Sequence, residues 1–310
     1  MGAAGAAPPR GSRALSLVAT LIANPARPVL TDRLIDRARG ALPGAEAPRV
    51  LDPGVAADLA LGGEHDREAA ARALRKALAP EPVDVVVQPV EGRRKRLLLA
   101  DMDSTMIEQE CIDELADIVG LRAEVAGITE RAMRGEVAFE PALRERVALL
   151  RGLPVGVVDR IIAERITLMP GGRALVATMR ANGAYACLVS GGFTLFTGPI
   201  SAAIGFHEHR ANRLVVEDEQ LAGRVEEPIL GREAKLATLV ELRRRLGLAP
   251  AETLAVGDGA NDLAMLEEAG LGVALHAKPA VAAAAHARVD HGDLTALLYL
   301  QGYARDEFAP

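Results

Sequence analysis

The chain has few cysteines, few aromatic residues and no tryptophan, and each shortage excludes a class of protein. Only Cys111 and Cys187 occur among 310 residues, so neither a disulfide framework nor a cysteine-based zinc site is expected. Both are expected to be small buried side chains in a reducing compartment. Aromatic residues make up 3% of the chain, which leaves Leu, Val, Ile and Ala to form the core. The net charge of −6 argues against nucleic acid or an anionic membrane as the main partner.

The sequence also lacks a long apolar run, since crossing a bilayer needs ~20 consecutive apolar residues. One shorter run, residues 14–23, follows Arg10 and Arg13, and it fits either a short signal peptide or a first strand. Ser16 and Thr20 inside the run favour the strand. We therefore expect a cytoplasmic protein with no membrane partner.

The first 95 residues predict a disordered tail and a small domain. Residues 1–12 consist mainly of Gly, Ala, Pro and Arg and are expected to be disordered. Hydrophobic periodicity then predicts a strand at 16–23, a helix at 30–42, two short strands within 47–61, a helix at 66–78 and a strand at 83–90. This βαββαβ order is the split-βαβ layout, and we assign it to a domain spanning residues 13–92. The polar residues 91–96 predict a linker.

The rest of the chain, residues 95–305, predicts an α/β domain. After residue 170, strands alternate with helices of 10–15 residues, which is typical of a doubly wound parallel sheet of the Rossmann type. Helices are expected at 173–182, 195–204, 233–246 and 262–269, strands at 185–190, 253–256 and 272–275, and hairpin-like pieces within 206–223. Residues 107–168 contain no convincing strand, and we expect them to form a helical cap inserted after the first strand.

Acidic residues stand where two of the predicted strands end. The apolar residues 97–100 run directly into Asp101 and Asp103, and another apolar strand runs into Asp258. Because parallel strands end at one edge of their sheet, these carboxylates are placed to share a divalent cation. Two acids at one strand end are often only a solvated turn, but the preceding apolar residues count against that reading here. Asp262 is expected to cap the next helix or support the site, with metal ligation as the alternative.

An ionised aspartate beside a neutralised phosphate is a competent nucleophile, and Asp101 fits that role. Magnesium and Lys235 would hold its pKa low, although Lys235 also fits a plain surface lysine. Asp103 is the candidate acid and base for the leaving alkoxide and the attacking water. The Thr105 hydroxyl is expected to hold the turn after the strand.

A third strand ends in Ser190-Gly191-Gly192. A hydroxyl and free backbone N–H groups at a strand-to-helix turn make a suitable phosphate cradle. The motif alone is weak evidence, because any tight loop can contain it.

Taken together, these motifs resemble the haloacid dehalogenase-like (HAD) hydrolases, in which Asp-x-Asp, Ser, Lys and Gly-Asp-Gly-x-Asn-Asp follow the same order. Within that superfamily the chain is similar to the phosphoserine phosphatases over about residues 95–300, with the closest likeness in 101–105, 110–114, 128–133, 189–193 and 256–262. Met102 stands where relatives often have Phe, a change of packing only. The first domain has a looser similarity to the ligand-binding domains called ACT.

The resemblance implies a magnesium-dependent hydrolysis of O-phospho-L-serine, the last step of serine biosynthesis, through an aspartyl-phosphate. It implies that Asp101 is the nucleophile and Asp103 the acid and base. Magnesium would bind Asp101, the carbonyl of Asp103 and Asp258, with Thr105, Gly192 and Asp262 in support. The implied substrate-binding residues are Glu110, Met133, Phe139, Arg146, Ser190, Gly191, Lys235 and Asn261.

Residues in the predicted cap are the candidates for substrate choice. By the resemblance, Glu110 meets the ammonium of the substrate. Phe139 and Arg146 are seven residues apart and so share a helix face. Arg146 is the candidate for the substrate carboxylate, while Phe139 and Met133 would exclude water. Alternatively Arg144, Arg146 and Arg151 form a solvated helix face.

Two alternative functions remain at this point. One is a related HAD phosphatase or phosphotransferase that acts on another small phospho-ester. The other is a regulatory amino-acid-binding protein, although a core without activity would be expected to have lost Asp101, Asp103, Lys235 or Asp258. The first domain is expected either to bind an amino acid or to pair two subunits into a homodimer.

Overall fold

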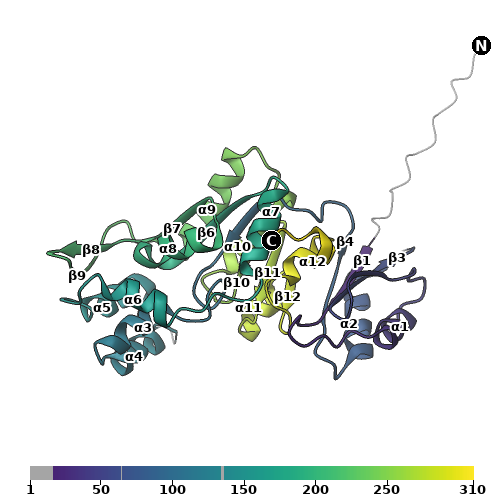
Figure 1. Cartoon of the computed structure of the whole chain (residues 1–310), viewed down its shortest axis with the longest axis horizontal. Coiled ribbons are helices and arrows are strands. Elements are labelled where there is room, and N and C mark those ends of the chain that lie inside the picture. Colours follow the sequence, from purple (N-terminus) through teal and green to yellow (C-terminus); the bar gives the residue numbers. More distant parts are fainter. Residues whose placement is uncertain (1–16, 64, 134–135) are drawn as a thin grey trace, which may run out of the picture.

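The computed structural model describes residues 17–63, 65–133 and 136–310, so the expected disordered tail 1–12 lies outside the described residues. An antiparallel sheet lies at one end of the molecule, a parallel sheet lies in the middle, and a helical cap lies at the other end (Figure 1). Within the described residues, no helix combines the length and the apolar character needed to span a bilayer.

The N-terminal sheet has the predicted βαββαβ order. Its elements are β1 (Leu17–Ile22), α1 (Asp32–Gly40), β2 (Arg49–Asp52), β3 (Ala56–Leu61), α2 (Arg67–Leu78) and β4 (Asp84–Pro89). The strands lie in the order β2-β3-β1-β4, and each adjacent pair is antiparallel. Helices α1 and α2 begin where the side chains of Thr31 and Asp66 accept backbone N–H groups, and they cover one face of the sheet.

The other face of this sheet packs against the C-terminal part of the chain. Ile22 of β1 and Val86 of β4 belong to the same buried apolar cluster as Tyr299 and Leu300 of α12 (Ala296–Leu300). The N-terminal sheet is therefore buried on both faces and shares one core with the rest of the molecule.

The segment predicted as a linker is partly buried in this contact. The Arg93 side chain is 10% exposed and donates to Asp58 Oδ2 at 2.7 Å and to Thr20 Oγ1 at 3.0 Å. It also donates to the backbone oxygens of Tyr299 and Leu300. Residues 91–96 thus connect the two parts along the chain, and Arg93 also holds them together through its side chain.

The central sheet is parallel throughout, as predicted. Its strands are β5 (Leu97–Ala100), β6 (Tyr185–Phe193), β7 (Glu208–Asn212), β10 (Thr253–Gly257), β11 (Leu271–Leu275) and β12 (Ala287–Val289). They lie in the order β12-β11-β10-β5-β6-β7, so the chain builds outward from β5 in one direction and from β10 in the other. The strand order therefore reverses between β5 and β10.

Helices cover both faces of the central sheet. Leu98 and Ala100 of β5 pack in the cluster of α7 (Gly172–Ala181), α8 (Thr194–Ile204) and α12. Leu97 and Leu99 point to the opposite face, in the cluster of α9 (Arg232–Arg245), α10 (Leu263–Glu268) and α11 (Pro279–Ala284). The sequence patterns missed β12, α11 and α12, and they assigned β7 to a hairpin although it is an edge strand of this sheet.

The cap contains the four helices between β5 and α7. These are α3 (Cys111–Ile118), α4 (Arg122–Met133), α5 (Phe139–Ala148) and α6 (Val157–Glu164). A hairpin of β8 (Leu214–Glu217) and β9 (Gln220–Val225), far away in sequence, packs against them. The backbone N–H of Gly152 donates to the carbonyl of Leu221, and the N–H of Leu221 donates to the carbonyl of Leu153, both at 2.8 Å. The cap is helical as predicted, but it also includes this second insertion.

Candidate active site

Three neighbouring strands deliver the polar residues singled out from the sequence. Asp101 directly follows β5 and Asp258 directly follows β10, on the two strands between which the strand order reverses. Ser190 lies within β6, which continues to Phe193 and does not end at the serine as predicted. Crevices at the carboxyl ends of strands beside such a reversal are the usual ligand sites of doubly wound sheets.

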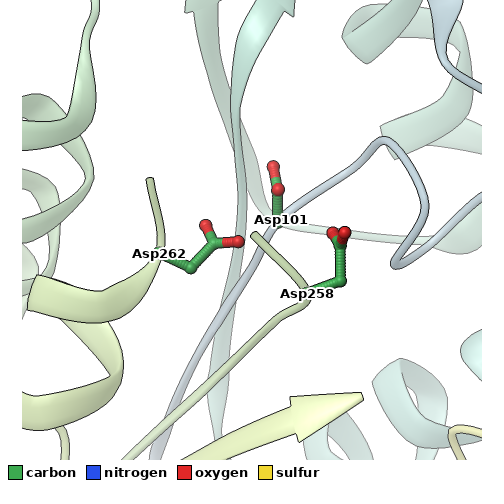
Figure 2. A group of neighbouring side chains, drawn as sticks. All are labelled: Asp101, Asp258 and Asp262. Atoms are coloured by element: carbon green, nitrogen blue, oxygen red, sulfur yellow. The ribbon is translucent and has the colours of Figure 1, made fainter. Parts of the chain in front are cut away.

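A cluster of three carboxylates lies in this crevice (Figure 2). Asp101, Asp258 and Asp262 each offer one oxygen, and these atoms lie within 4.8 Å of one another. The buried Lys235 reaches the cluster from α9, with its Nζ 2.6 Å from Asp101 Oδ1 and 2.7 Å from Asp262 Oδ1. Gly257 leaves the necessary room, because a Cβ atom there would lie 2.4 Å from Asp262 Oδ2.

Asp262 occupies the N-cap position of α10, but its side chain makes no capping hydrogen bond. Its carboxylate instead accepts from Lys235 Nζ and from the backbone N–H of Gly259. Of the two expected roles, capping is not observed, and the contacts are those of a residue that supports the carboxylate cluster. The two bonded oxygens leave Asp262 less free than Asp101 or Asp258 to hold a metal ion.

The charges in the cluster do not balance. Burial and the charge of Asp262 raise the pKa of Asp101 well above its ordinary value, although Lys235 opposes the shift. Burial and Asp262 also raise the pKa of Asp258. Burial lowers the pKa of Lys235, but Asp101 and Asp262 outweigh it, and the net shift is upward. With all three carboxylates ionised, the cluster and the Lys235 ammonium would carry an excess of two negative charges. A hard divalent cation with oxygen ligands would neutralise this excess and so favour the ionised forms.

One oxygen of Asp101 remains available for chemistry. Oδ1 is engaged by Lys235 and by the backbone N–H of Met102 at 2.8 Å. Oδ2 has no hydrogen bond to any described residue, and Asp101 lines a cavity at this point. The hydrogen bonds to Oδ1 thus fix the orientation of the carboxylate and leave Oδ2 available to react with a molecule in the cavity.

Asp103 lies in the turn after β5, and both of its carboxylate oxygens accept hydrogen bonds. Oδ1 accepts from the backbone N–H of Cys111 at 2.9 Å, and Oδ2 accepts from the Ser190 hydroxyl at 3.1 Å. The Ser190 Oγ in turn accepts the backbone N–H of Gly192 at 2.8 Å. This N–H group is therefore already paired, so Gly192 supports Ser190 and does not offer a free donor to phosphate.

The hydroxyls after β5 have specific partners across the site. Thr105 Oγ1 donates to Asp258 Oδ1 at 3.1 Å, so it orients a carboxylate 153 positions away and does not hold its own turn as expected. Ser104, with a left-handed φ of 54°, donates its hydroxyl to Glu110 Oε1 at 2.7 Å. These contacts connect the turn after β5 to both sides of the cavity.

A cavity of about 460 Å³ brings most of the predicted residues together. Its lining from the parallel sheet and its loops includes Asp101, Asp103, Ser190, Gly191, Gly192, Asp258 and Asn261, and its lining from the cap includes Glu110, Phe139 and Arg146. Lys235 contacts Asp101 but is not part of this lining. The side chain of Met133, also predicted, is outside the described part of the structure. Glu110 is exposed to the cavity, yet partial burial and the charge of Asp103 raise its pKa to about 7.

Phe139 and Arg146 of α5 line the cavity from the same helix face, as predicted. The Phe139 ring lies over two glycines, since a Cβ atom on Gly191 or Gly231 would lie 3.5 Å from it. Arg146 donates to the carbonyl of Ala142 and to Thr129 Oγ1, each at 3.3 Å, but it makes no ion pair with a described residue, and burial lowers its pKa. Arg144 is exposed and pairs with two glutamates, so the alternative of a common solvated face does not hold for Arg146.

Among the charged residues that line the cavity, one was not predicted from the sequence. Lys278 follows β11, the next strand outward from β10, and its side chain lines the cavity with Asp258 and Asn261. The one sequence feature that could have indicated Lys278 is its position between an apolar strand and Pro279, a proline at the first position of a helix.

Comparisons with known proteins agree with this geometry. The family model described as haloacid dehalogenase-like hydrolase matches residues 98–267. A phosphoserine phosphatase of Archaeoglobus fulgidus is 41% identical over 237 residues, which cover 76% of this chain and 69% of that protein. Phosphoserine phosphatase SerB2 of Mycobacterium tuberculosis is 43% identical over 76% of this chain, and the match spans 58% of its length.

Among solved structures, the unliganded form of a probable phosphoserine phosphatase from Vibrio cholerae superposes with a TM-score of 0.76 at 31% identity. The match covers 94% of this chain and 88% of that one. The likeness therefore extends beyond the parallel sheet to nearly the whole chain. With its family match, its relatives and its strand-end carboxylates, the chain belongs to the phosphoserine phosphatases of the haloacid dehalogenase-like hydrolase family.

Proposed function

We propose that the protein hydrolyses O-phospho-L-serine to serine and phosphate, as the last step of serine biosynthesis. The observation that carries this proposal is the distribution of charge in the cavity. Asp101 and Ser190 lie on the sheet side. Glu110 and Arg146, which makes no ion pair with a described residue, lie on the cap side. A molecule with a phosphate, an ammonium and a carboxylate finds a complementary group for each.

In the proposed reaction, Asp101 Oδ2 forms a bond to phosphorus while the bond from phosphorus to the serine oxygen breaks. Asp103 donates a proton to that oxygen as it leaves. Asp103 then accepts a proton from a water molecule whose oxygen attacks the phosphoaspartate, and the bond from phosphorus to Asp101 breaks. Ser190, Gly191, Asn261 and Lys235 hold the phosphate, which requires Lys235 to keep its place beside Asp101.

We further propose that magnesium is the cofactor. Asp101, Asp258 and the carbonyl of Asp103 would hold it, and the excess negative charge of the cluster together with its oxygen donors supports a hard divalent ion. When bound, such an ion neutralises phosphate charge during the transfer. Thr105, through its bond to Asp258, and Asp262, through its bond to Lys235, would keep these ligands oriented.

The direct test is phosphate release from O-phospho-L-serine with magnesium and after removal of magnesium by a chelator. We expect turnover only with the ion and full recovery when magnesium is restored. A panel of other small phospho-esters addresses the remaining alternative, a related phosphatase with a different substrate. Preference for any of these over phosphoserine would replace the proposed substrate.

Replacing Arg146 with Ala should raise KM for phosphoserine while sparing the hydrolysis of an aryl phosphate, which has no carboxylate. Loss of a charge-assisted pair in a partly buried site costs about 2–3 kcal/mol, or roughly 30- to 150-fold in kcat/KM. Arg144→Ala is the matched control, because Arg144 lies on the same helix and is exposed. Equal losses on both substrates would remove Arg146 from substrate recognition.

We also propose the division of the chain into a tail (1–12), an ACT-like domain (13–92) and a HAD-like phosphatase domain (95–305) with a cap inserted at about 107–168. The strand order β2-β3-β1-β4 and the βαββαβ connectivity support the assignment of the first domain. A cytoplasmic location is supported by Cys111 and Cys187, both free and buried. A homodimer formed through the first domain stays a proposal.

A further inference from the structure

Lys278 is a cation at the cavity that the proposed reaction leaves unused. Its backbone is firmly held. His276, two residues earlier and with φ 45°, donates its backbone N–H to the carbonyl of Val289 and bonds through Nε2 to the carbonyl of Gly292. The carbonyl of Lys278 itself accepts the first backbone N–H groups of α11. A fixed main chain therefore carries this side chain to the cavity wall.

The ammonium group, in contrast, is free. Lys278 is exposed, and its Nζ makes no hydrogen bond or ion pair with any residue in the described part of the chain. A charge used for stability would have a carboxylate or carbonyl partner, as Lys235 and Lys95 do. Truncation of Lys278 should accordingly leave the fold intact.

The charged side chains that line the cavity indicate what the Lys278 ammonium could do. Four carboxyl groups line it (Asp101, Asp103, Glu110 and Asp258), against two cationic side chains, Arg146 and Lys278. A phosphate monoester approaches as a dianion. Lys235 and the proposed magnesium ion offset charge at Asp101 and Asp258, but Asp103 and Glu110 still repel the ester near the wall. Arg146 is partly buried in the cap, so Lys278 is the exposed cation that an entering phosphate meets at this wall.

We propose that Lys278 is a substrate-capture residue, which draws the anionic phosphate ester into the cavity and lowers KM without taking part in the chemistry. The inference rests on the proposed phosphatase activity but not on the identity of the ester. Attraction of this kind acts over several ångströms and is screened by salt, because the Debye length falls from about 30 Å at 0.01 M to about 3 Å at 1 M ionic strength.

The test measures kcat and KM for Lys278→Ala at about 0.01 M and about 1 M ionic strength, with magnesium saturating throughout. We expect kcat/KM to fall about 10-fold at low ionic strength, mostly through KM, and the difference from wild type to shrink below about 2-fold at high ionic strength. Lys278→Arg should retain the wild-type salt dependence. Lys76→Ala removes the same charge from an exposed position on α2 and should change nothing.

A loss for Lys278→Ala that is equal at both ionic strengths, or that lies in kcat alone, would overturn the proposal. An equal loss for Lys76→Ala would overturn it as well, since the effect would then come from net charge. Both phosphoserine and an aryl phosphate are measured. If the aryl phosphate shows the salt-dependent loss and phosphoserine is not turned over, the capture role stands and the proposed substrate fails.

Discussion

Asp101→Asn is expected to lower kcat for phosphoserine by about 10⁴-fold or more, because an amide cannot form the proposed bond to phosphorus and loss of a covalent nucleophile has effects of this size. The fold should persist, since Lys235 keeps its 2.7 Å contact with Asp262 and the crowded cluster loses one negative charge. Steady-state assays and thermal unfolding of the same preparation measure the two effects.

Asp159→Asn, at an exposed carboxylate on α6, is the matched control and should retain wild-type activity. Beryllium fluoride provides a second readout, because it forms a stable mimic of a phosphoaspartate. Its adduct should form on residue 101 and be absent from Asp101→Asn. An adduct on any other residue, or near wild-type turnover by the variant, would contradict the nucleophile assignment.

Arg93→Met is expected to give the largest loss of stability, about 3–5 kcal/mol in the free energy of unfolding, because it leaves Asp58 buried without its ion-pair partner. The Asp58 side chain is 6% exposed and cannot recover the interaction with water. Urea unfolding followed by circular dichroism measures the change.

Arg96→Met is the control three residues away. Arg96 is 62% exposed and pairs with Glu252 at 3.2 Å, so its loss should cost less than about 1 kcal/mol. The double variant Arg93→Met with Asp58→Leu should be less destabilised than the sum of the two single variants, because neither leaves a lone charge. Additive effects would show that the pair is not energetically coupled.

The active-site strands could be predicted because their signal is local. Residues 97–100 and 253–256 are short apolar runs that end in acids, and parallel strands with such ends meet at one edge of a sheet. The same reasoning brought Asp101 and Asp258 together correctly. The hydrogen-bond partner of each side chain could not be predicted in the same way. The Thr105 hydroxyl, for example, donates to Asp258, which is 153 positions away in the sequence.

The missed features depend on long-range contacts. Helix α12 has five residues, all buried, so it shows no amphipathic period to read. The β8–β9 hairpin has its own turn signals, but nothing local indicates that it binds the cap near Gly152. Arg93 stands in a run of charged residues that is typical of an exposed segment, and its burial depends on partners far away in the sequence, Asp58 on one side and the carbonyls of Tyr299 and Leu300 on the other.

The sheet at the N-terminal end, buried on both faces, limits how this protein can be divided. Cutting the chain near residue 92 would expose Tyr299 and Leu300 to water on one fragment and Ile22 and Val86 on the other. Each fragment would then expose an apolar surface that favours aggregation. A change in the packing of the N-terminal sheet would therefore alter the contacts of α12 directly, and α12 packs on the parallel sheet that carries the active site.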